Sequence, residues 1–534
     1  MPKLFRSALA AALASWSLIA AAQVQEAPPP PRFEIRRFNV EGNTLLSARD
    51  VERTVAPFVG KDRDFGDVQR ALEALEAAYV ARGYSAVRVS IPEQDLVAGE
   101  VRLRVVESRI RTVKVEGNRF FNDDNVRASL PALKPGEPPN TRRISENAQL
   151  ANENPVKQER VTFEAADEPG KVDAVVKVTD DKPVRVNMFL DNTGTSPTGF
   201  YRAGIGYQHA NLWNSDAVLN AQFITSPDQV ENVRIWGFGY HIPVYARSGS
   251  VDIFAGHSSV NSGVVQSLFS VAGAGTVMGG RYNQVLPRLG SYEQKLIFGY
   301  DYRSFSNSVV QVGTNVSLLP DLNVQPLSIG YNGRLSQVGR DITLYGTLSW
   351  NVPAGSDGDQ NAFSATRAGA RSRYVIWRFG SAYSQVIGKD YLFRASFIGQ
   401  YTRDLLVPGE QFGMGGVDNV RGFFEREVSN DVGHRVSLEL YGREFGEKLG
   451  GTWQARPLVF VDWARGNDNT PVRNLFNAAN GLSSVGIGAR LSQGKSLSIR
   501  VDWAVVANGD LYPGASAGRP VGKDRLHFSL NYAF

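Results

Sequence analysis

The strongest constraint on the fold is a two-residue alternation of apolar and polar side chains that runs from about Val184 to the C-terminus. In a β-strand, successive side chains point to opposite faces, so each alternating segment predicts a strand with one apolar face. In the last such segment, that face carries Leu526, Phe528, Leu530, Tyr532 and Phe534. Aromatic residues end the apolar faces, and Arg, Asp and Gln occupy the polar faces. This distribution favours a barrel with lipid outside and water inside over a soluble sandwich.

We expect sixteen antiparallel strands in this barrel, which would occupy residues 184–534. They are predicted to start near residues 184, 199, 216, 229, 248, 266, 291, 325, 339, 372, 390, 433, 454, 482, 495 and 523. A tilted membrane-spanning strand needs about 9 to 11 residues, which leaves enough chain for short turns at one end and long loops at the other. An even count is typical of bacterial barrels, and sixteen strands enclose an aqueous lumen.

The N-terminus differs from the rest of the chain. Lys3 and Arg6 precede an apolar run from Ala8 to Ala22, which predicts a signal peptide over residues 1–22, followed by a proline-rich linker over residues 23–32. A membrane-anchor helix is the alternative, but the run is short for one. No later stretch reaches the roughly 18 apolar residues of a membrane helix, so the mature protein is either soluble and exported or a β-barrel in a membrane.

The composition excludes several classes of chemistry. The chain has no cysteine, which excludes disulfides, thiolate metal sites and cysteine nucleophiles. A net charge of +5 without a basic cluster argues against nucleic-acid binding. The five histidines are scattered, and the glycine-rich stretch 272–279 lacks the lysine of a phosphate-binding loop. We therefore expect no cofactor, no metal and no enzymatic activity.

Two repeated modules precede the barrel. Val40-Glu41-Gly42-Asn43 recurs 75 residues later as Val115-Glu116-Gly117-Asn118. Each copy predicts a strand, a Gly-Asn turn, a helix capped by Ser47 or Asn122, a second helix and two strands. We thus expect two β-α-α-β-β domains, over residues 33–108 and 109–183. Their short sheets leave edges that could dock an extended peptide by main-chain pairing, or the modules could be rigid spacers.

A long polar stretch over about residues 402–432 separates the eleventh and twelfth predicted strands. Loops of this length are usually functional or disordered, and Val420, Arg421, Gly422 and Phe423 would suit a loop folded into the lumen. Alternation in the thirteenth strand directs Phe460 and Asp462 inward. An Arg421–Asp462 pair shielded by Phe460 and Phe423 would clamp the loop to the wall. Two separately solvated charges are the alternative.

These residues also carry a family resemblance. Val420-Arg421-Gly422-Phe423 resembles the VRG(Y/F) loop motif, and Phe460-Val461-Asp462 resembles the F-x-D wall motif, of the TpsB transporters of two-partner secretion, the haemolysin and filamentous haemagglutinin secretion type. These transporters belong to a larger group of POTRA-plus-barrel proteins, and the two modules look like a tandem POTRA pair. Each motif is short, but the chain carries a signal peptide, two modules, sixteen strands and both motifs in the order of these transporters. The resemblance covers residues 33–534.

The resemblance implies an outer-membrane translocator of a Gram-negative bacterium, with its POTRA modules in the periplasm. It would recognise an unfolded exoprotein there through residues 33–183 and secrete it through the lumen without nucleotide hydrolysis. The partner would be a TpsA-like adhesin, cytolysin or toxin, and Arg421, Asp462 and Phe460 would form the family's loop-to-wall lock. An assembly factor that inserts other barrels, and a passive porin or uptake receptor, are the alternatives.

Two further expectations follow from the resemblance. The terminal aromatic strand with Leu530, Tyr532 and Phe534 looks like the signal read by the barrel assembly machinery, and the outward apolar face would contact outer-membrane lipids. Some family members place a helix from their N-terminus in the lumen as a plug. The stretch from Gln23 to Arg32, with its consecutive prolines, is too short for such a helix, so we expect the folded-in loop to contribute more of the seal.

Overall fold

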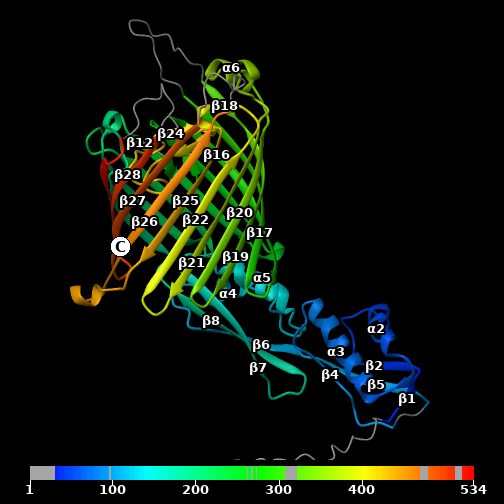
Figure 1. Cartoon of the computed structure of the whole chain (residues 1–534). Coiled ribbons are helices and arrows are strands. Elements are labelled where there is room, and N and C mark those ends of the chain that lie inside the picture. The colour runs from blue at the N-terminus through cyan, green and yellow to red at the C-terminus, as the bar shows by residue number, and fades with distance from the viewer. Residues whose placement is uncertain are drawn as a thin grey trace, which may run out of the picture. The chain divides into compact units, whose positions relative to one another are not determined.

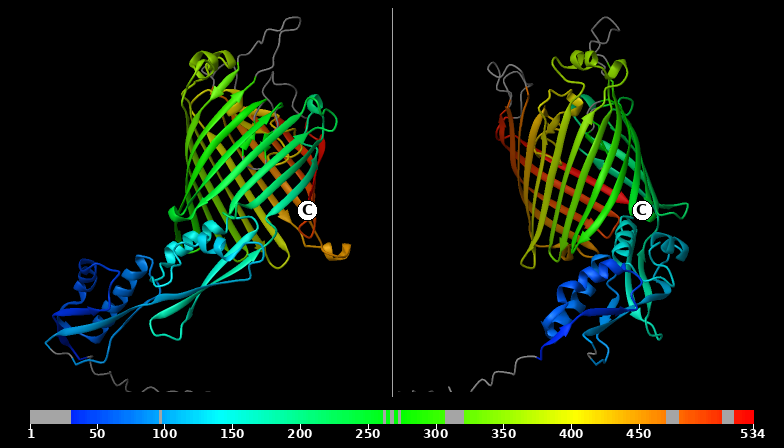
Figure 2. Two further views of the ribbon diagram at one scale, coloured as in Figure 1. Left: turned by 180° about the vertical axis from the view of Figure 1, so that it is seen from behind. Right: turned by 90° about the vertical axis from the view of Figure 1, so that its right-hand side faces the viewer.

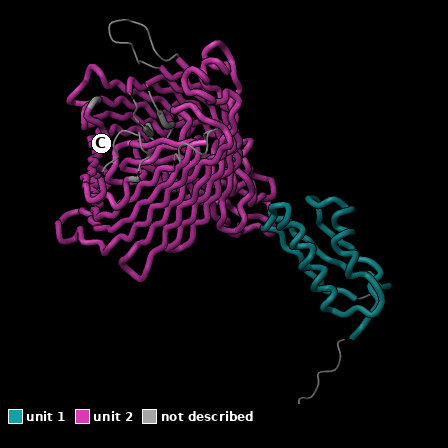
Figure 3. Tube along the Cα trace, turned by 45° about the horizontal axis from the view of Figure 1, so that its top comes forward, with its two compact units in different colours: residues 1–108 teal, residues 109–534 magenta. Residues whose placement is uncertain are grey.

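The computed structural model describes residues 31–95, 98–260, 263–265, 269–271, 274–306, 321–469, 479–510 and 520–534. It divides into two compact units, residues 1–108 and 109–534 (Figure 3). The predicted signal peptide, most of the proline-rich linker and residue 266, the predicted start of the sixth barrel strand, lie outside the described residues. No helix in the described part of the chain is long and apolar enough to cross a membrane.

The first unit is a small α+β module. Its elements are β1 (Phe33–Ile35), β2 (Arg37–Glu41), α2 (Ala48–Val55), η1 (Ala56–Phe58), β3 (Gly60–Arg63), α3 (Phe65–Ala81), β4 (Val87–Ser90) and β5 (Glu100–Glu107). The main sheet has the order β2-β5-β4, and Ser47 caps α2 as predicted. The apolar face of α3 is buried in the core and consists of Val68, Leu72, Leu75 and Tyr79.

The second module opens the other unit and repeats this plan. Its elements are β6 (Arg109–Glu116), α4 (Asp123–Ser129), α5 (Thr141–Ala151), β7 (Lys157–Ala165) and β8 (Lys171–Asp180). The sheet order is β6-β8-β7, so β8 is central and β6 and β7 are its edges. Asn122 caps α4 through the N–H of Asn125. Both modules therefore have one central strand and two edge strands.

The Gly-Asn turns have a structural role in both modules. Gly42 and Gly117 have φ of 83° and 88°, where L side chains are strained, and a Cβ at either glycine would collide with a carbonyl of the central strand. The side-chain amides of Asn43 and Asn118 donate hydrogen bonds to the main-chain carbonyls of Leu46 and Phe121, three residues further along the chain. The central strand then ends in a carboxylate, Glu107 or Asp180, that accepts N–H groups just after the turn.

Replacing Gly117 with alanine should destabilise the second module more than replacing Gly136. Both glycines have similar positive φ, 88° and 85°, but the new Cβ at 117 would lie 2.5 Å from the carbonyl oxygen of Val178, whereas nothing lies within 4 Å of the one at 136. The conformational strain of about 1–2 kcal/mol is common to both substitutions. In thermal unfolding of the full chain, Gly117→Ala should lower the unfolding temperature more than Gly136→Ala does. Equal losses would mean that the close approach contributes nothing.

The rest of the chain forms a closed antiparallel barrel. Its sixteen main strands are β9 (Val184–Asp191), β10 (Arg202–Leu212), β11 (Ala217–Thr225), β12 (Arg234–Val244), β13 (Gly249–Ser258), β16 (Gly275–Leu289), β17 (Tyr292–Phe305), β19 (Pro326–Gln337), β20 (Arg340–Asn351), β21 (Val375–Ile387), β22 (Tyr391–Tyr401), β25 (Val432–Tyr441), β26 (Trp453–Asn467), β27 (Ala479–Gln493), β28 (Leu497–Asp510) and β29 (Asp524–Ala533). A short strand, β18 (Leu322–Val324), extends the wall beside β17. The predicted sixteen-stranded barrel is confirmed.

The sixth strand corrects one predicted boundary. It begins at Gly275, nine residues after the predicted start at 266. A separate short hairpin, β14 (Gly263–Val265) with β15 (Phe269–Val271), lies between β13 and β16 in the sequence. Its apolar residues continue the alternation of the wall, which is why the pattern alone placed the strand too early.

The faces of the wall follow the alternation. Val459, Val461 and Trp463 on β26 are exposed on the outside, whereas Phe460 and Asp462 are buried on the inside. At the seam, β29 pairs with β9, and the terminal Phe534 exchanges two main-chain hydrogen bonds with Val186. Leu530, Tyr532 and Phe534 are exposed on the outer face.

The two ends of the barrel differ (Figures 1 and 2). Short turns lie at the end that carries the second module with α4 and α5, and longer loops with α6 (Gln360–Thr366) lie at the other end. The connection between β22 and β25 folds back on itself. It contains η5 (Pro408–Glu410) and a hairpin of β23 (Phe412–Met414) with β24 (Val428–Asn430). We call residues 402–431 the lumen loop, because its side chains meet inward-facing residues of the wall.

Candidate functional site

The tip of the lumen loop is held by Arg421. Its Nε and Nη2 donate to the two carboxylate oxygens of Asp462 at 2.7 and 2.8 Å, and its main-chain N–H donates to Oδ2 at 3.1 Å. The planar guanidinium therefore binds the carboxylate in a bidentate manner, which the single ammonium group of a lysine could not do. Both side chains are almost fully buried. The structure thus brings together the two residues that the sequence suggested as partners.

The other predicted residues enclose this pair. The guanidinium of Arg421 stacks on the ring of Phe460, with Cζ 3.4 Å from the ring centroid. Val420 and Phe423 are fully buried in a small apolar cluster with residues of the hairpin and the wall. Gly422 has φ of 94° and lies against Ala504 and Val506 of β28. Burial and stacking exclude water, so the charges interact more strongly than exposed ones would.

Several residues of the site were not predicted. Glu439 accepts a 2.8 Å bond from Nη1 of Arg421, and Ser437 donates to Asp462 at 2.6 Å. The main-chain N–H of Gly422 donates to Nε2 of His527 at 2.9 Å. Alternation along β25 places the side chains of Ser437 and Glu439 on its inner face, so the sequence pattern could have identified both as lumen-facing residues. We call Arg421, Asp462, Phe460, Ser437 and Glu439 the lock.

A second layer of charge surrounds the lock. Asp502 of β28 lies 3.7 Å from Nη1 of Arg421 and accepts bonds from Arg490 and Arg500. Arg500 in turn reaches the loop, where it donates to Asp418 at 2.6 Å and to the carbonyl of Val417 at 2.7 Å. The loop tip is therefore fastened to three wall strands, β25, β26 and β28, by one connected ionic network.

The start of the lumen loop has a second anchor on other wall strands. The carboxylate of Glu410 is buried and binds Arg303 of β17 at 2.6 Å and Arg378 of β21 at 3.0 Å. The end of the loop is held by Asp431, which pairs with Arg367 and accepts the N–H of Leu406 at 3.0 Å. Sequence reasoning missed these anchors because it sought a partner only for Arg421. The loop therefore bridges the lumen from β17 and β21 to β26 and β28.

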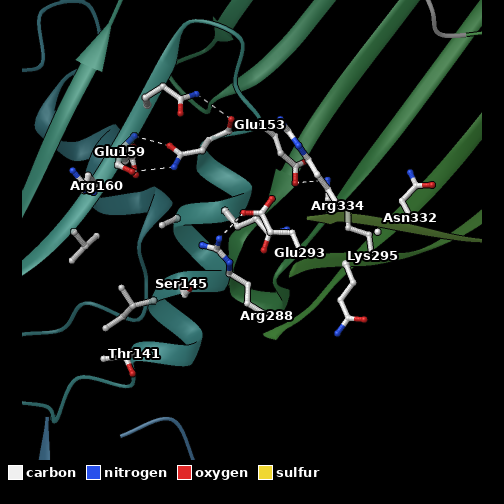
Figure 4. Close-up of a pocket in the computed structure, with 18 of the residues that line it drawn as sticks. Thr141, Ser145, Glu153, Glu159, Arg160, Arg288, Glu293, Lys295, Asn332 and Arg334 are labelled. Carbon is white, nitrogen blue, oxygen red and sulfur yellow. Dashed lines mark hydrogen bonds and ion pairs between the residues drawn. The ribbon is translucent and has the colours of Figure 1, made fainter. Parts of the chain in front are cut away.

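A cavity of about 970 Å³ lies where the second module meets the barrel mouth (Figure 4). The module contributes residues of α5 and β7, including Glu159 and Arg160 of β7, and Glu153 from the connection between the two elements. The barrel contributes the start of β17 and parts of β19 and β20, including Lys295 and Tyr345. Tyr345 also lines a smaller cavity inside the lumen, so the two spaces share a wall residue.

The module is fixed to the barrel beside this cavity by a buried ionic cluster. Nζ of Lys157 on β7 lies 2.7 Å from a carboxylate oxygen of Glu159 and 2.7 Å from one of Asp216, which follows β10. It also donates to Asn125 at 3.0 Å, and Tyr245 of η3 (Tyr245–Arg247) donates to Asp216 at 2.6 Å. We call these five residues the docking network. Burial raises the pKa of the Glu159 carboxyl, although Lys157 opposes the shift.

Comparison with known proteins assigns the family. The family model described as haemolysin secretion/activation protein ShlB/FhaC/HecB matches residues 170–491, and the model of the ShlB-type POTRA domain matches residues 33–108. This chain belongs to the ShlB/FhaC/HecB family. Like its relatives, this ShlB/FhaC/HecB protein is an outer-membrane transporter of two-partner secretion, with its POTRA modules in the periplasm.

The individual relatives agree with this assignment. The outer membrane transporter CdiB of Escherichia coli O6:K15:H31 (strain 536 / UPEC) is 23% identical over 465 residues, which cover 85% of this chain and 77% of that protein. The hemolysin transporter protein HpmB of Proteus mirabilis is 23% identical over 420 residues, 75% of this chain and 70% of that protein. The solved structure of CdiB from Escherichia coli matches with a TM-score of 0.75 at 20% identity, covering 97% of this chain and 93% of that one. CdiB from Escherichia coli thus has the same fold as this chain.

Proposed function

We propose that this transporter receives an unfolded TpsA-like exoprotein, an adhesin, cytolysin or toxin, on its second POTRA module and passes it through the lumen once the lock releases. The observation that carries this proposal is the buried, two-pronged Arg421–Asp462 bridge, which closes the lumen loop across the channel. Translocation runs without nucleotide, and folding of the exoprotein outside the cell prevents its return.

The edge strand β7 is the docking edge that this proposal favours. The amide of Asn152 already binds the main-chain N–H and carbonyl of Glu159, which therefore point away from β8. Because the direction of main-chain groups alternates, those of Val161 and Phe163 face the same free edge. Both residues line the cavity at the barrel mouth. A peptide added to this edge would therefore lie directly in front of the lumen.

Replacing Val161 with proline should lower export about two- to tenfold, the cost of one lost main-chain hydrogen bond. Proline removes an N–H that faces the free edge and leaves the ladder with β8 intact, which an edge strand tolerates. The exoprotein is first identified as the protein that vanishes from the medium when the transporter gene is deleted, and its amount is then measured for each variant. Val161→Ala keeps the N–H and serves as the control. Unchanged export by a folded Val161→Pro variant would contradict docking on β7.

Two further partners complete the proposal. The outer face of β29, with Leu530, Tyr532 and Phe534, carries exposed apolar side chains that end at the C-terminus. These residues would be read by the barrel assembly machinery during insertion. Outer-membrane lipids would then cover the apolar outer face of the wall.

A further inference from the structure

A cavity of about 360 Å³ inside the lumen is lined by four arginines. Arg281, Arg303 and Arg378 come from three wall strands, β16, β17 and β21, and Arg426 comes from the lumen loop. Asp301 is the one carboxylate among the described residues that line the cavity. This space lies apart from the lock, at the opposite anchor of the loop.

The charges around this cavity do not balance. Asp301 pairs with Arg281 and with Arg303, and Glu410, which lies just outside the lining, pairs with Arg303 and Arg378. Four guanidinium groups thus share two carboxylates, which leaves an excess of two positive charges. Charged groups drawn out of bulk water are stabilised only when a counter-charge or a polar partner reaches them.

Arg426 is the member of this group that lacks a carboxylate. Its Nη2 donates to the carbonyls of Pro408 and Gln411 at 3.3 and 3.1 Å, and no acidic side chain of the described chain lies within ion-pair distance of it. Its backbone has φ of 50°, which is uncommon for a residue other than glycine. A Cβ on Gly413 would lie 2.8 Å from Cγ and Nη1 of Arg426, so the side chain is packed closely against that glycine. The loop therefore holds this cation in place.

We propose that this cavity binds a doubly charged oxyanion such as inorganic phosphate or sulfate. Guanidinium groups recognise tetrahedral oxyanions through planar pairs of N–H donors, and two negative charges match the excess. Such an ion would join Arg426 of the loop to the arginines of the wall. It would thereby add a noncovalent tie at the Glu410 anchor, independent of the Arg421 lock.

The test uses the full chain in detergent, titrated with sodium sulfate and with inorganic phosphate by isothermal titration calorimetry in chloride buffer. We expect saturable binding near one ion per chain. Sulfate should also raise the unfolding temperature above that in chloride at equal ionic strength. Arg426→Gln should weaken binding at least tenfold. Gly413→Ala, which displaces the guanidinium without removing it, should weaken binding as well.

Arg394→Gln is the matched control. Arg394 lies on β22 and lines a different cavity, so its loss should change the affinity less than twofold. Retained heat-modifiable migration of each variant in gel electrophoresis shows that the barrel has folded. The proposal is overturned if the wild-type chain shows no saturable binding, or if folded Arg426→Gln and Gly413→Ala variants both bind as tightly as wild type.

Discussion

Replacing Arg421 with aspartate is expected to abolish export. The substitution removes the guanidinium that fills the space between Asp462 and Glu439 and places a third carboxylate beside them. Removing one partner of a buried ion pair costs about 3–5 kcal/mol. The loop tip should therefore leave the wall and be unable to return to the locked state from which the proposed transport begins, and the amount of exoprotein in the medium measures the loss of export. Arg421→Lys keeps the charge but loses the fork and the stacking on Phe460, so its export should be intermediate.

The reversed pair tests whether the two residues act together. Asp462→Arg alone should also abolish export, whereas the double variant Arg421→Asp with Asp462→Arg should restore part of it. Full recovery is not expected, because Glu439 and Asp502 remain beside the new aspartate. Arg394→Asp is the control, since this lumen arginine stacks on Tyr441 of the wall and does not hold the loop. A double variant no better than either single variant would exclude the pairing as the basis of the effect.

Alternation explains why much of the architecture could be predicted. On a barrel strand, every second residue faces lipid, so a strand shifted by one residue would turn its polar and charged side chains toward the membrane. This constraint placed Asp462 inward and Val461 outward, as the structure has them. The repeated Gly-Asn turns were recognisable for a similar reason, because a positive φ at Gly42 and Gly117 strongly favours glycine.

The remaining members of the site could not be predicted in the same way. Glu439, Asp502 and His527 lie on three different strands, β25, β28 and β29, and they meet the loop only because the barrel closes with a particular stagger. Alternation fixes which face a residue takes but not its height along the barrel axis. The hairpin β14–β15 shows the complementary error, since apolar residues outside the wall can carry the same pattern.

Lys157 shows a different limit of the sequence. In the segment KQERVTF it has the composition of a solvated strand edge, yet its side chain is fully buried. Its burial depends on the chain after β10, where Trp213, Asn214 and Asp216 adopt positive φ and bring a carboxylate to it. No local sequence pattern in the module predicts that Lys157 contacts Asp216, in a turn about 60 residues away.

Replacing Lys157 with methionine should therefore loosen the second module from the barrel. The variant leaves Glu159 and Asp216 buried without their cation, at a cost of about 3–5 kcal/mol. Spin labels on cysteines introduced at Glu164 and Lys448 report the module-to-barrel distance, because the chain has no cysteine of its own. We expect one narrow distance distribution in the wild type and a broad one in Lys157→Met, together with loss of export.

A second substitution, Asp216→Asn, and a change of pH show whether Lys157→Met loosens the module through unpaired charge or through lost packing. Adding Asp216→Asn to Lys157→Met removes one of the two buried carboxylates that have lost their cation, so the spin-label distance distribution should narrow again. Burial raises the pKa of Glu159, so its contribution to docking is complete below the ordinary value of 4.5 and is lost as the pH rises through the raised value. Without Lys157, which opposes that shift, the distribution in the single variant should be narrower at low pH than at neutral pH. A distribution that is equally broad at every pH and in the double variant would show that packing, not charge, holds the module.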